Sequence, residues 1–203
     1  MKPQPDRVLP LFQQTGAYLT GHFRLSSGLH SSNYLQSALV LAHPAHAEAL
    51  GGLLQEMLTG PSGIVKDGAS IDFVISPALG GLIIGHEVAR ALGVPFLFTE
   101  RDAERKMALR RGFTIKAGQR AIVIEDVITT GGSTLEVIDI LRGFGAIPVA
   151  AGSIIDRSGG KADLGIPRVA LETLTVEAFP ADNCPMCRAG EPVTKPGSRP
   201  VST

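Results

Sequence analysis

Residues 121–134 read Ala-Ile-Val-Ile-Glu-Asp-Val-Ile-Thr-Thr-Gly-Gly-Ser-Thr. An apolar strand leads directly into two adjacent carboxylates, Glu125 and Asp126, and a run of threonines and glycines follows. Residues 133–144 then have the apolar spacing of a helix. Glycines let the backbone approach a ligand, hydroxyls donate hydrogen bonds, and a helix N-terminus presents free N–H groups. The stretch therefore predicts a phosphate-binding loop at the carboxyl end of a strand, with carboxylates suited to ribose hydroxyls or a metal-bound sugar.

Two other nucleotide-binding motifs do not fit this stretch. No lysine follows the glycines, which excludes a Walker loop, and no G-x-G-x-x-G is present, which excludes a dinucleotide fingerprint. The simplest alternative is an ordinary strand–turn–helix in which a serine or threonine caps the helix. The combination of paired carboxylates, threonines and glycines favours a ligand-binding loop over that alternative.

The rest of the chain alternates strands with helices. Short apolar strands are predicted at 71–76, 95–99, 121–124 and 147–155, and helices at 80–92 and 133–144. This alternation indicates an α/β fold with a mostly parallel central sheet flanked by helices. Upstream, 6–16 and 44–58 have helical spacing and 18–36 has the alternation of a hairpin. Downstream, 169–179 is strand-like, and we expect an irregular tail from Pro180 onward.

The composition favours one domain spanning residues 1–203. Apolar residues make up 44% and charged residues 19%, so the chain can bury a core. Nineteen basic and nineteen acidic residues give a net charge of zero, which argues against a nucleic-acid coat or a polybasic membrane binder. We see no signal peptide and no apolar run long enough to span a membrane, and two cysteines make no disulfide framework. The expected location is the cytoplasm, without nucleic-acid or membrane partners.

Four segments resemble a known enzyme family. Residues 123–134 resemble the phosphoribosyl-pyrophosphate (PRPP) signature of the type I phosphoribosyltransferases. Residues 21–34 (GHFRLSSGLHSSNY) resemble the base-covering hood of the orotate phosphoribosyltransferases, and 76–82 (SPALGGL) resemble the pyrophosphate loop of that family. Residues 153–157 (SIIDR) resemble the family's strand that ends in an orotate-binding arginine. The four segments occur in the family's order between about residue 18 and residue 160.

The resemblance implies the type I phosphoribosyltransferase fold, with a small hood built from about residues 18–36 and from C-terminal residues. It implies transfer of the phosphoribosyl group from PRPP to orotate, with Lys106 and Asp126 as catalytic residues. The residues implied in PRPP binding are Ala78, Leu79, Gly80, Gly81, Arg101, Arg105, Lys106, Glu125, Asp126, Val127, Ile128, Thr129, Thr130, Gly131, Gly132, Ser133 and Thr134. The residues implied in orotate binding are Ser26, Tyr34, Leu35, Thr129 and Arg157.

Residues 100–111 form a charged run, with eight charged residues in twelve. By itself such a run favours a solvated helix or hairpin, and the alternative is a mobile basic loop over an anionic substrate. The resemblance implies the second interpretation, in which the loop carries Lys106 into the neighbouring site of a homodimer. It also implies Mg²⁺ as cofactor, bound mainly through PRPP and without direct protein ligands.

The chain also departs from the family's better-known bacterial pattern. Ser26 and Gly80 stand where that pattern has lysines, and its usual histidine is missing from the basic loop. We therefore expect Mg²⁺ and the remaining arginines to meet the phosphate charge.

The tail contains a C-x-x-C pair, Cys184 and Cys187. One such pair is half of a zinc site, and no second pair or histidine cluster follows it. We favour a structural turn with two buried thiols over an intersubunit zinc site or a redox pair. His22 and His30 lie in the predicted hood, but the histidine spacing predicts no metal site.

Two other functions are open alternatives. A phosphoribosyltransferase for a purine or other base is disfavoured by the hood and by Arg157, because a purine has no carboxylate to pair with. A regulator with this fold that binds RNA or DNA would need a basic face or an added domain. The neutral chain and the loop lysine favour an enzyme.

Overall fold

The computed structural model describes residues 8–25, 27–66, 70–175 and 177–195. Its centre is a sheet with the strand order β5-β4-β3-β6-β7-β8. The strands are β3 (Phe73–Pro77), β4 (Phe96–Arg101), β5 (Met107–Leu109), β6 (Arg120–Ile128), β7 (Ile147–Asp156) and β8 (Arg168–Thr173). All neighbours pair in parallel except β5, which runs antiparallel to β4. The predicted α/β fold with a mostly parallel sheet is therefore confirmed.

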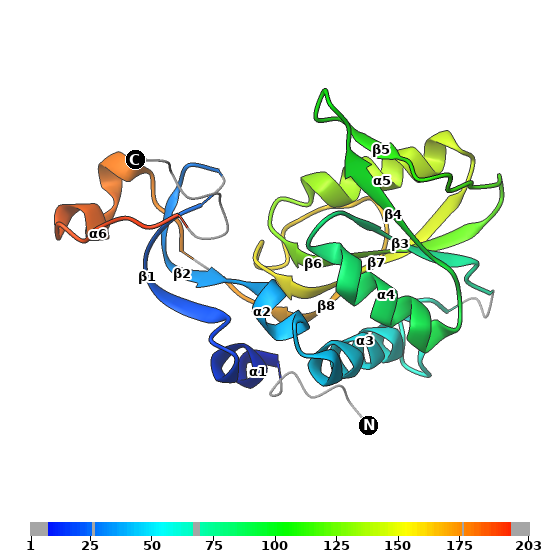
Figure 1. Cartoon of the computed structure of the whole chain (residues 1–203), viewed down its shortest axis with the longest axis horizontal. Helices are drawn as coiled ribbons and strands as arrows, with labels where there is room; N and C mark the ends of the chain where they lie inside the picture. The colour runs from blue at the N-terminus through cyan, green and yellow to red at the C-terminus, as the bar shows by residue number, and fades with distance from the viewer. Residues whose placement is uncertain (1–7, 26, 67–69, 176, 196–203) are drawn as a thin grey trace.

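Helices cover both faces of this sheet (Figure 1). α3 (Pro44–Thr59) and α4 (Gly81–Leu92) pack on one face, and α5 (Gly132–Gly143) packs on the other. Strand residues alternate between the faces, so that Ile122 lies in the core under α3 and α4 whereas Val123 lies under α5. Both side chains are fully buried, which explains why the central strands are almost continuous apolar runs.

The connections diverge between β3 and β6, which lie side by side in the sheet. From β3 the chain passes through α4 to β4 on one side, and from β6 it passes through α5 to β7 on the other. The loops that follow the two strands therefore separate at the carboxyl edge of the sheet, where open α/β sheets form ligand-binding crevices. These loops, 78–80 and 129–131, lie in two of the segments that the sequence singles out.

A smaller group of elements stands beside the sheet, and we call it the hood lobe: residues 18–25, 27–35 and 177–195. β1 (Tyr18–Arg24) and β2 (His30–Leu35) form an antiparallel pair with a register shift between Thr20 and Phe23. The C-terminal segment hydrogen-bonds to both strands, because Thr194 bonds to the backbone of β1 and Phe179 bonds to that of β2. Figure 1 shows the lobe set apart from the helices that cover the sheet.

The structure also corrects several predicted boundaries. α1 (Val8–Gln14) is present as expected, but α2 (Ser37–Leu41) has no counterpart in the prediction. The tail that we expected to be irregular contains η2 (Ala181–Asn183) and α6 (Pro185–Arg188). β6 continues through both carboxylates, beyond its predicted end at 124, and β8 ends well before 179. Within the described residues, no helix is both long enough and apolar enough to cross a membrane.

Candidate active site

The loop between β6 and α5 forms a small cradle of about 70 Å³. Glu125 and the continuous run 127–134 line it. Gly131 stands at the N-cap of α5 with a φ of 83°, and a Cβ added there would lie 2.7 Å from the Leu164 side chain, so only glycine fits. Gly131 itself makes no side-chain cap hydrogen bond, but Thr130 Oγ1 accepts a long hydrogen bond of 3.4 Å from the Gly132 N–H, so a threonine caps the helix only weakly. Apart from this long contact, the N–H groups of the first turn remain available to a ligand.

Glu125 and Asp126 stand near the end of β6, against the loop that follows β3. A Cβ added to Gly80 would lie 2.5 Å from Asp126 Oδ1, and one added to Gly81 would lie 3.4 Å from Glu125 Oε1. Glu125 is 8% exposed, and its burial, followed by the neighbouring charge of Asp126, raises the pKa of its carboxyl well above the usual value. The contact at Gly80 means that a lysine in this position would force Asp126 to move.

A larger cleft of about 440 Å³ adjoins the cradle. Its walls come from the β1–β2 hairpin, the β6–α5 loop, the end of β7 and the C-terminal segment. The lining residues are Leu25, Ser27, Leu29, Tyr34, Leu35, Gln36, Asp126, Val127, Thr129, Thr130, Arg157 and Ala178. Val127, Thr129 and Thr130 line both hollows, so one ligand can occupy the cradle and the cleft together.

Arg157 is the only cationic side chain in the described lining of this cleft. Its Nε is buried and has no hydrogen-bond partner. Burial lowers the pKa of Arg157, and the nearby Tyr34 opposes that effect. Burial likewise raises the pKa of Tyr34, against the opposite influence of Arg157. A buried guanidinium nitrogen without a partner is costly, and a planar anion in the cleft would relieve that cost.

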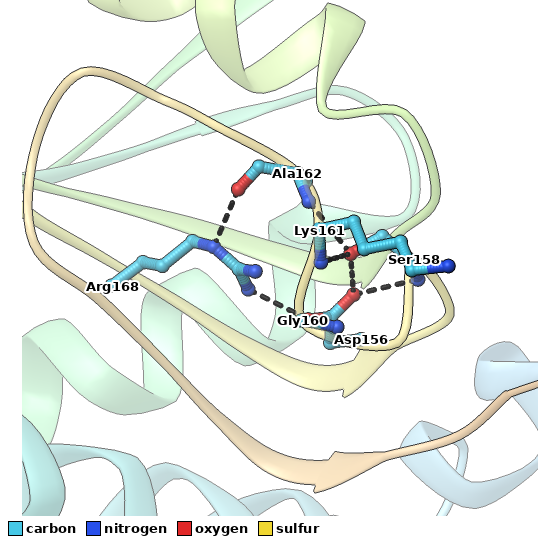
Figure 2. A network of polar contacts seen from close by, with 6 residues as sticks. All are labelled: Asp156, Ser158, Gly160, Lys161, Ala162 and Arg168. Atoms are coloured by element: carbon cyan, nitrogen blue, oxygen red, sulfur yellow. Dashed lines mark hydrogen bonds and ion pairs between the residues drawn. The ribbon is translucent and has the colours of Figure 1, made fainter.

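The segment that follows Arg157 is fixed by a network of polar contacts around Asp156 (Figure 2). Asp156 accepts hydrogen bonds from Ser158 Oγ at 2.6 Å and from Arg168 Nη1 at 2.7 Å, while Arg168 Nε donates to the Ala162 carbonyl. Burial acts to raise the pKa of Asp156, but the hydrogen bonds from Ser158 and Arg168 outweigh it, and the pKa lies below its usual value. The network ties the start of β8 to the end of β7, next to Arg157.

The charged run forms a hairpin in which β5 returns along β4. Figure 1 shows it projecting from the edge of the sheet. Arg101 donates to both oxygens of Glu136 on α5, at 2.7 and 3.2 Å, and Arg105 and Lys106 are exposed at the turn. None of these basic residues is in the described lining of the cradle or the cleft. The structure thus does not bring Lys106 into the site of its own chain.

The predicted and observed linings of the cleft differ at several residues. Ser26, which we expected to contact the base, lies outside the described residues. Leu25, Ser27, Leu29 and Gln36 line the cleft although only their hairpin, and not these side chains, was assigned to the site, and Ala178 was missed altogether. Nothing in a short, irregular stretch with one small residue signals such a role.

The hood lobe also brings Cys184 and Cys187 together with His22 and His30. The potential ligand atoms of the four side chains all lie within 4.8 Å of one another. Cys184 is buried, but Cys187 is exposed, so the expectation of two buried thiols is wrong for the second. Sequence reasoning noted all four residues and did not connect them.

Comparison with known proteins places this geometry in a family. The model of the phosphoribosyl transferase domain matches residues 38–179, which is more than two thirds of the chain. The chain belongs to the phosphoribosyltransferase family. The predicted type I phosphoribosyltransferase fold is confirmed by this match and by the solved structures below.

Two curated relatives of this phosphoribosyltransferase are orotate phosphoribosyltransferases. The orotate phosphoribosyltransferase of Pelotomaculum thermopropionicum is 49% identical over 196 residues, covering 97% of this chain and 98% of the relative. That of Desulforamulus reducens is 46% identical over 197 residues, with the same coverage of both chains. Among solved structures, the orotate phosphoribosyltransferase of Aeropyrum pernix has a TM-score of 0.67 and 28% identity over 82% of this chain and 93% of its own. The predicted resemblance to the orotate branch is confirmed.

A likeness to other branches is confined to the fold. The adenine phosphoribosyltransferase of Thermoanaerobacter pseudethanolicus has a TM-score of 0.58 and 17% identity, over 70% of this chain and 88% of its own. The fold is therefore shared with a phosphoribosyltransferase that is named for a purine, and the choice of base must be argued from the cleft.

Proposed function

We propose that this phosphoribosyltransferase transfers the phosphoribosyl group of PRPP to N1 of orotate, giving orotidine 5-phosphate and pyrophosphate. The observation that carries the proposal is the buried, unpartnered Nε of Arg157 in a cleft that adjoins a phosphate-type cradle. Orotate carries a planar carboxylate on its ring, and a guanidinium can meet that group with two parallel hydrogen bonds. The full-length relatives named for orotate support the same choice of base.

PRPP would lie across the two hollows. Its 5-phosphate would take the cradle, where the first turn of α5 and the hydroxyls of Thr130 and Thr134 offer donors. Its ribose hydroxyls would meet Glu125 and Asp126. Its pyrophosphate would meet the backbone of Leu79, Gly80 and Gly81, because the Ala78 N–H is already donated to the Thr99 carbonyl at 2.7 Å.

Orotate would occupy the larger cleft. Arg157 would hold the carboxylate from one side, and Tyr34, Leu35 and Thr129 would contact the ring. Asp126 lines this cleft near the place where ring nitrogen and ribose carbon meet, so its carboxylate would stabilise positive charge on the ribose ring as the bond to pyrophosphate breaks. The electron pair of that bond leaves with pyrophosphate, N1 forms the new bond to carbon 1, and the proton that N1 carries in orotate passes to pyrophosphate or to solvent.

Cationic groups would stabilise the departing pyrophosphate. Lys106 would supply charge by closure of the hairpin, with Arg101 and Arg105 as further phosphate contacts. Mg²⁺ would bind mainly through PRPP, whose phosphate and ribose oxygens are the hard ligands that it prefers, and it would neutralise phosphate charge beside the ribose-facing carboxylates of Glu125 and Asp126. The homodimer that exchanges this hairpin and the cytoplasmic location are parts of the same proposal.

The decisive experiment follows the ultraviolet absorbance of orotate mixed with the protein, PRPP and Mg²⁺. We expect a loss of the orotate signal that needs all components and falls at least about 100-fold in Lys106→Ala and Asp126→Asn. Asp139→Asn, an exposed carboxylate elsewhere on α5, serves as the matched control and should retain full activity. Adenine, hypoxanthine and uracil are run in parallel.

Two outcomes would contradict the proposal. Turnover of another base without turnover of orotate would assign the protein to base salvage. PRPP binding without turnover of any base would favour a ligand-sensing protein.

A further inference from the structure

The hood lobe contains a compact cluster of two histidines and two cysteines, none of which is in the described lining of the cradle or the cleft. His22 Nε2 lies 3.6 Å from Cys184 Sγ and 3.6 Å from Cys187 Sγ. His30 Nδ1 lies 3.2 Å from Cys187 Sγ and 2.8 Å from His22 Nε2. Among the described residues, this is the one group of three or more His, Cys, Asp or Glu side chains that could hold a metal ion.

We propose that His22, His30, Cys184 and Cys187 form a structural Zn²⁺ site. Tetrahedral Zn²⁺ has Zn–S bonds of about 2.3 Å and Zn–N bonds of about 2.0 Å, so its ligand atoms lie about 3.3 to 3.8 Å apart. Two of the three nitrogen–sulfur distances, at 3.6 Å each, lie within this range, and the third, at 3.2 Å, lies just below it. The two ring nitrogens are nearer to each other, and a small rotation of either imidazole would open that edge. Four protein ligands fill the coordination shell, which is the pattern of a structural site.

The hydrogen bond behind His22 orients it as a ligand. His22 Nδ1 lies 2.8 Å from the Glu191 carbonyl oxygen. A carbonyl can only accept, so Nδ1 carries the proton and, in the neutral ring, Nε2 presents its lone pair to the cluster. Ligating histidines in metal sites are typically held through such a contact from the other ring nitrogen. Glu191 belongs to the C-terminal segment, so the contact also ties that segment to β1.

The charges balance without further partners. Two thiolates and two neutral imidazoles around Zn²⁺ sum to zero, which is the condition for burying an ion at low cost. His22 and His30 are only 5% and 6% exposed, and Cys184 is fully buried. Two buried imidazoles and a buried thiol facing one point are thus accounted for by one cation.

The hood lobe has little else at its centre. A two-stranded sheet is marginal in water without further support. Both large apolar cores belong to the main sheet, and neither includes Phe23, Cys184 or Met186, the lobe's own buried apolar side chains other than Leu35. Small units with so little apolar core commonly depend on a metal or on disulfides. The Zn²⁺ site would add metal–ligand bonds to the backbone hydrogen bonds that already join the hairpin to the C-terminal segment.

The site would also shape the base-binding cleft, an extension that rests on the proposed function. The C-terminal segment is anchored to β2 at Phe179, next to Ala178 in the cleft wall. β2 itself carries Tyr34 and Leu35 to the same wall. Loss of the metal should therefore weaken orotate binding while PRPP binding to the cradle on the main sheet changes little.

The test measures metal content directly and does not depend on activity. The full chain is produced with zinc in the medium, purified without chelators under reducing conditions, and analysed by plasma mass spectrometry. We expect one zinc per chain in the unaltered protein and in His86→Asn, whose histidine is exposed on α4. We expect its loss in Cys184→Ser/Cys187→Ser and in His30→Asn.

A second measurement covers the case in which these variants fail to fold. Co²⁺ is exchanged into the unaltered protein, where tetrahedral coordination by thiolates gives intense visible and near-ultraviolet bands. Modification of the two thiols by an organomercurial should then release one equivalent of metal. Absence of both zinc and the cobalt bands in the reduced, folded protein would overturn the proposal. So would zinc retained by the double cysteine variant, or a Cys184–Cys187 disulfide in protein kept under reducing conditions.

Discussion

At the residue scale, Arg157 combines a stability cost with a binding role. Its Nε is buried without a partner, and burial lowers its pKa, so the free protein gains nothing from this charge. We expect Arg157→Met to leave Tm unchanged or slightly raised while kcat/KM for orotate falls about 100-fold or more. Arg157→Lys should be intermediate, because it keeps the charge and loses the fork. Thermal unfolding and steady-state kinetics test this, and a KM increase for PRPP equal to that for orotate would refute it.

Glu125 also carries a stability cost, because burial and the charge of Asp126 disfavour its ionised form and together raise its pKa. A carboxyl whose pKa is higher in the folded than in the unfolded chain favours folding when protonated, and its ionisation at higher pH opposes folding. Glu125→Gln should therefore raise Tm at neutral pH by about 2–4 °C. This gain should shrink as the pH falls toward about 4.3, the ordinary glutamate pKa.

The same substitution should weaken ligand binding. Glu125→Gln removes an oxygen charge that faces the cradle, so PRPP with Mg²⁺ should raise its Tm less than it raises that of the unaltered protein. Asp139→Asn, on the exposed side of α5, is the control and should shift neither quantity. A lower Tm for Glu125→Gln at neutral pH would contradict this account.

At the scale of elements, the Asp156 network joins the end of β7 to the start of β8. Asp156 is 1% exposed and pairs with Arg168, so Asp156→Asn leaves a mostly buried guanidinium without its counter-charge. We expect a loss of about 3 kcal/mol and a fall in Tm of about 6–12 °C at neutral pH. Folding lowers the pKa of Asp156. The stabilisation that its carboxylate gives the folded protein is therefore present above about pH 3.9 and is lost as the pH falls through the folded pKa.

The controls for this prediction separate the loss of the Asp156 charge from the loss of hydrogen bonds around it. Ser158→Ala removes the hydroxyl's hydrogen bond to Asp156 and the two that it accepts from the Lys161 and Ala162 N–H groups, but no charge, and should cost about 1–2 kcal/mol, less than Asp156→Asn. Arg157 follows Asp156 directly, so Asp156→Asn should also raise KM for orotate more than KM for PRPP. Chemical denaturation at neutral and acidic pH, with kinetics on the same samples, tests both parts. Equal stability of Asp156→Asn and the unaltered protein at neutral pH would contradict the account.

At the scale of the whole molecule, the sequence predicts what local chemistry determines. The segment 121–143 is recognisable because one strand, one turn and one helix carry their own signals: an apolar run, paired carboxylates and Gly131. The sheet can be predicted as well, since its central strands are apolar runs that helices separate in the sequence. The hood cluster is different, because His22 and Cys184 are 162 residues apart and meet only after the C-terminal segment pairs with the hairpin.

The conformation of the charged run could not be predicted from the sequence either. Alternating charges do not show whether residues 100–111 close over the cleft or extend from the sheet, because both states are solvated. In the structure, the Arg101–Glu136 pair and the β4–β5 ladder favour the extended hairpin. An exposed ion pair of this kind contributes little, about 1 kcal/mol at most, so substrate phosphates can compete for Arg101.

The extended hairpin leads to a prediction about assembly. Lys106 is exposed outside the site of its own chain, and we propose that it serves the neighbouring site of a homodimer with two-fold symmetry. Lys106→Ala and Arg157→Met should then each be nearly inactive. The first variant lacks the residue that a chain gives to its neighbour's site, and the second lacks a residue of the chain's own cleft. In a mixed dimer, the Arg157→Met chain would deliver its intact Lys106 to the intact cleft of the Lys106→Ala chain.

Co-refolding the two variants in equal amounts tests this directly. Half of the dimers should be mixed, each with one complete site, so the orotate assay should recover about one quarter of the unaltered activity. Each variant refolded alone should recover none, and adding excess of either should reduce the fraction of mixed dimers and the activity with it. If Lys106 acts within its own chain, every mixed dimer has two defective sites and no activity returns. The recovered fraction therefore distinguishes a hairpin that closes over its own cleft from one that completes its neighbour's.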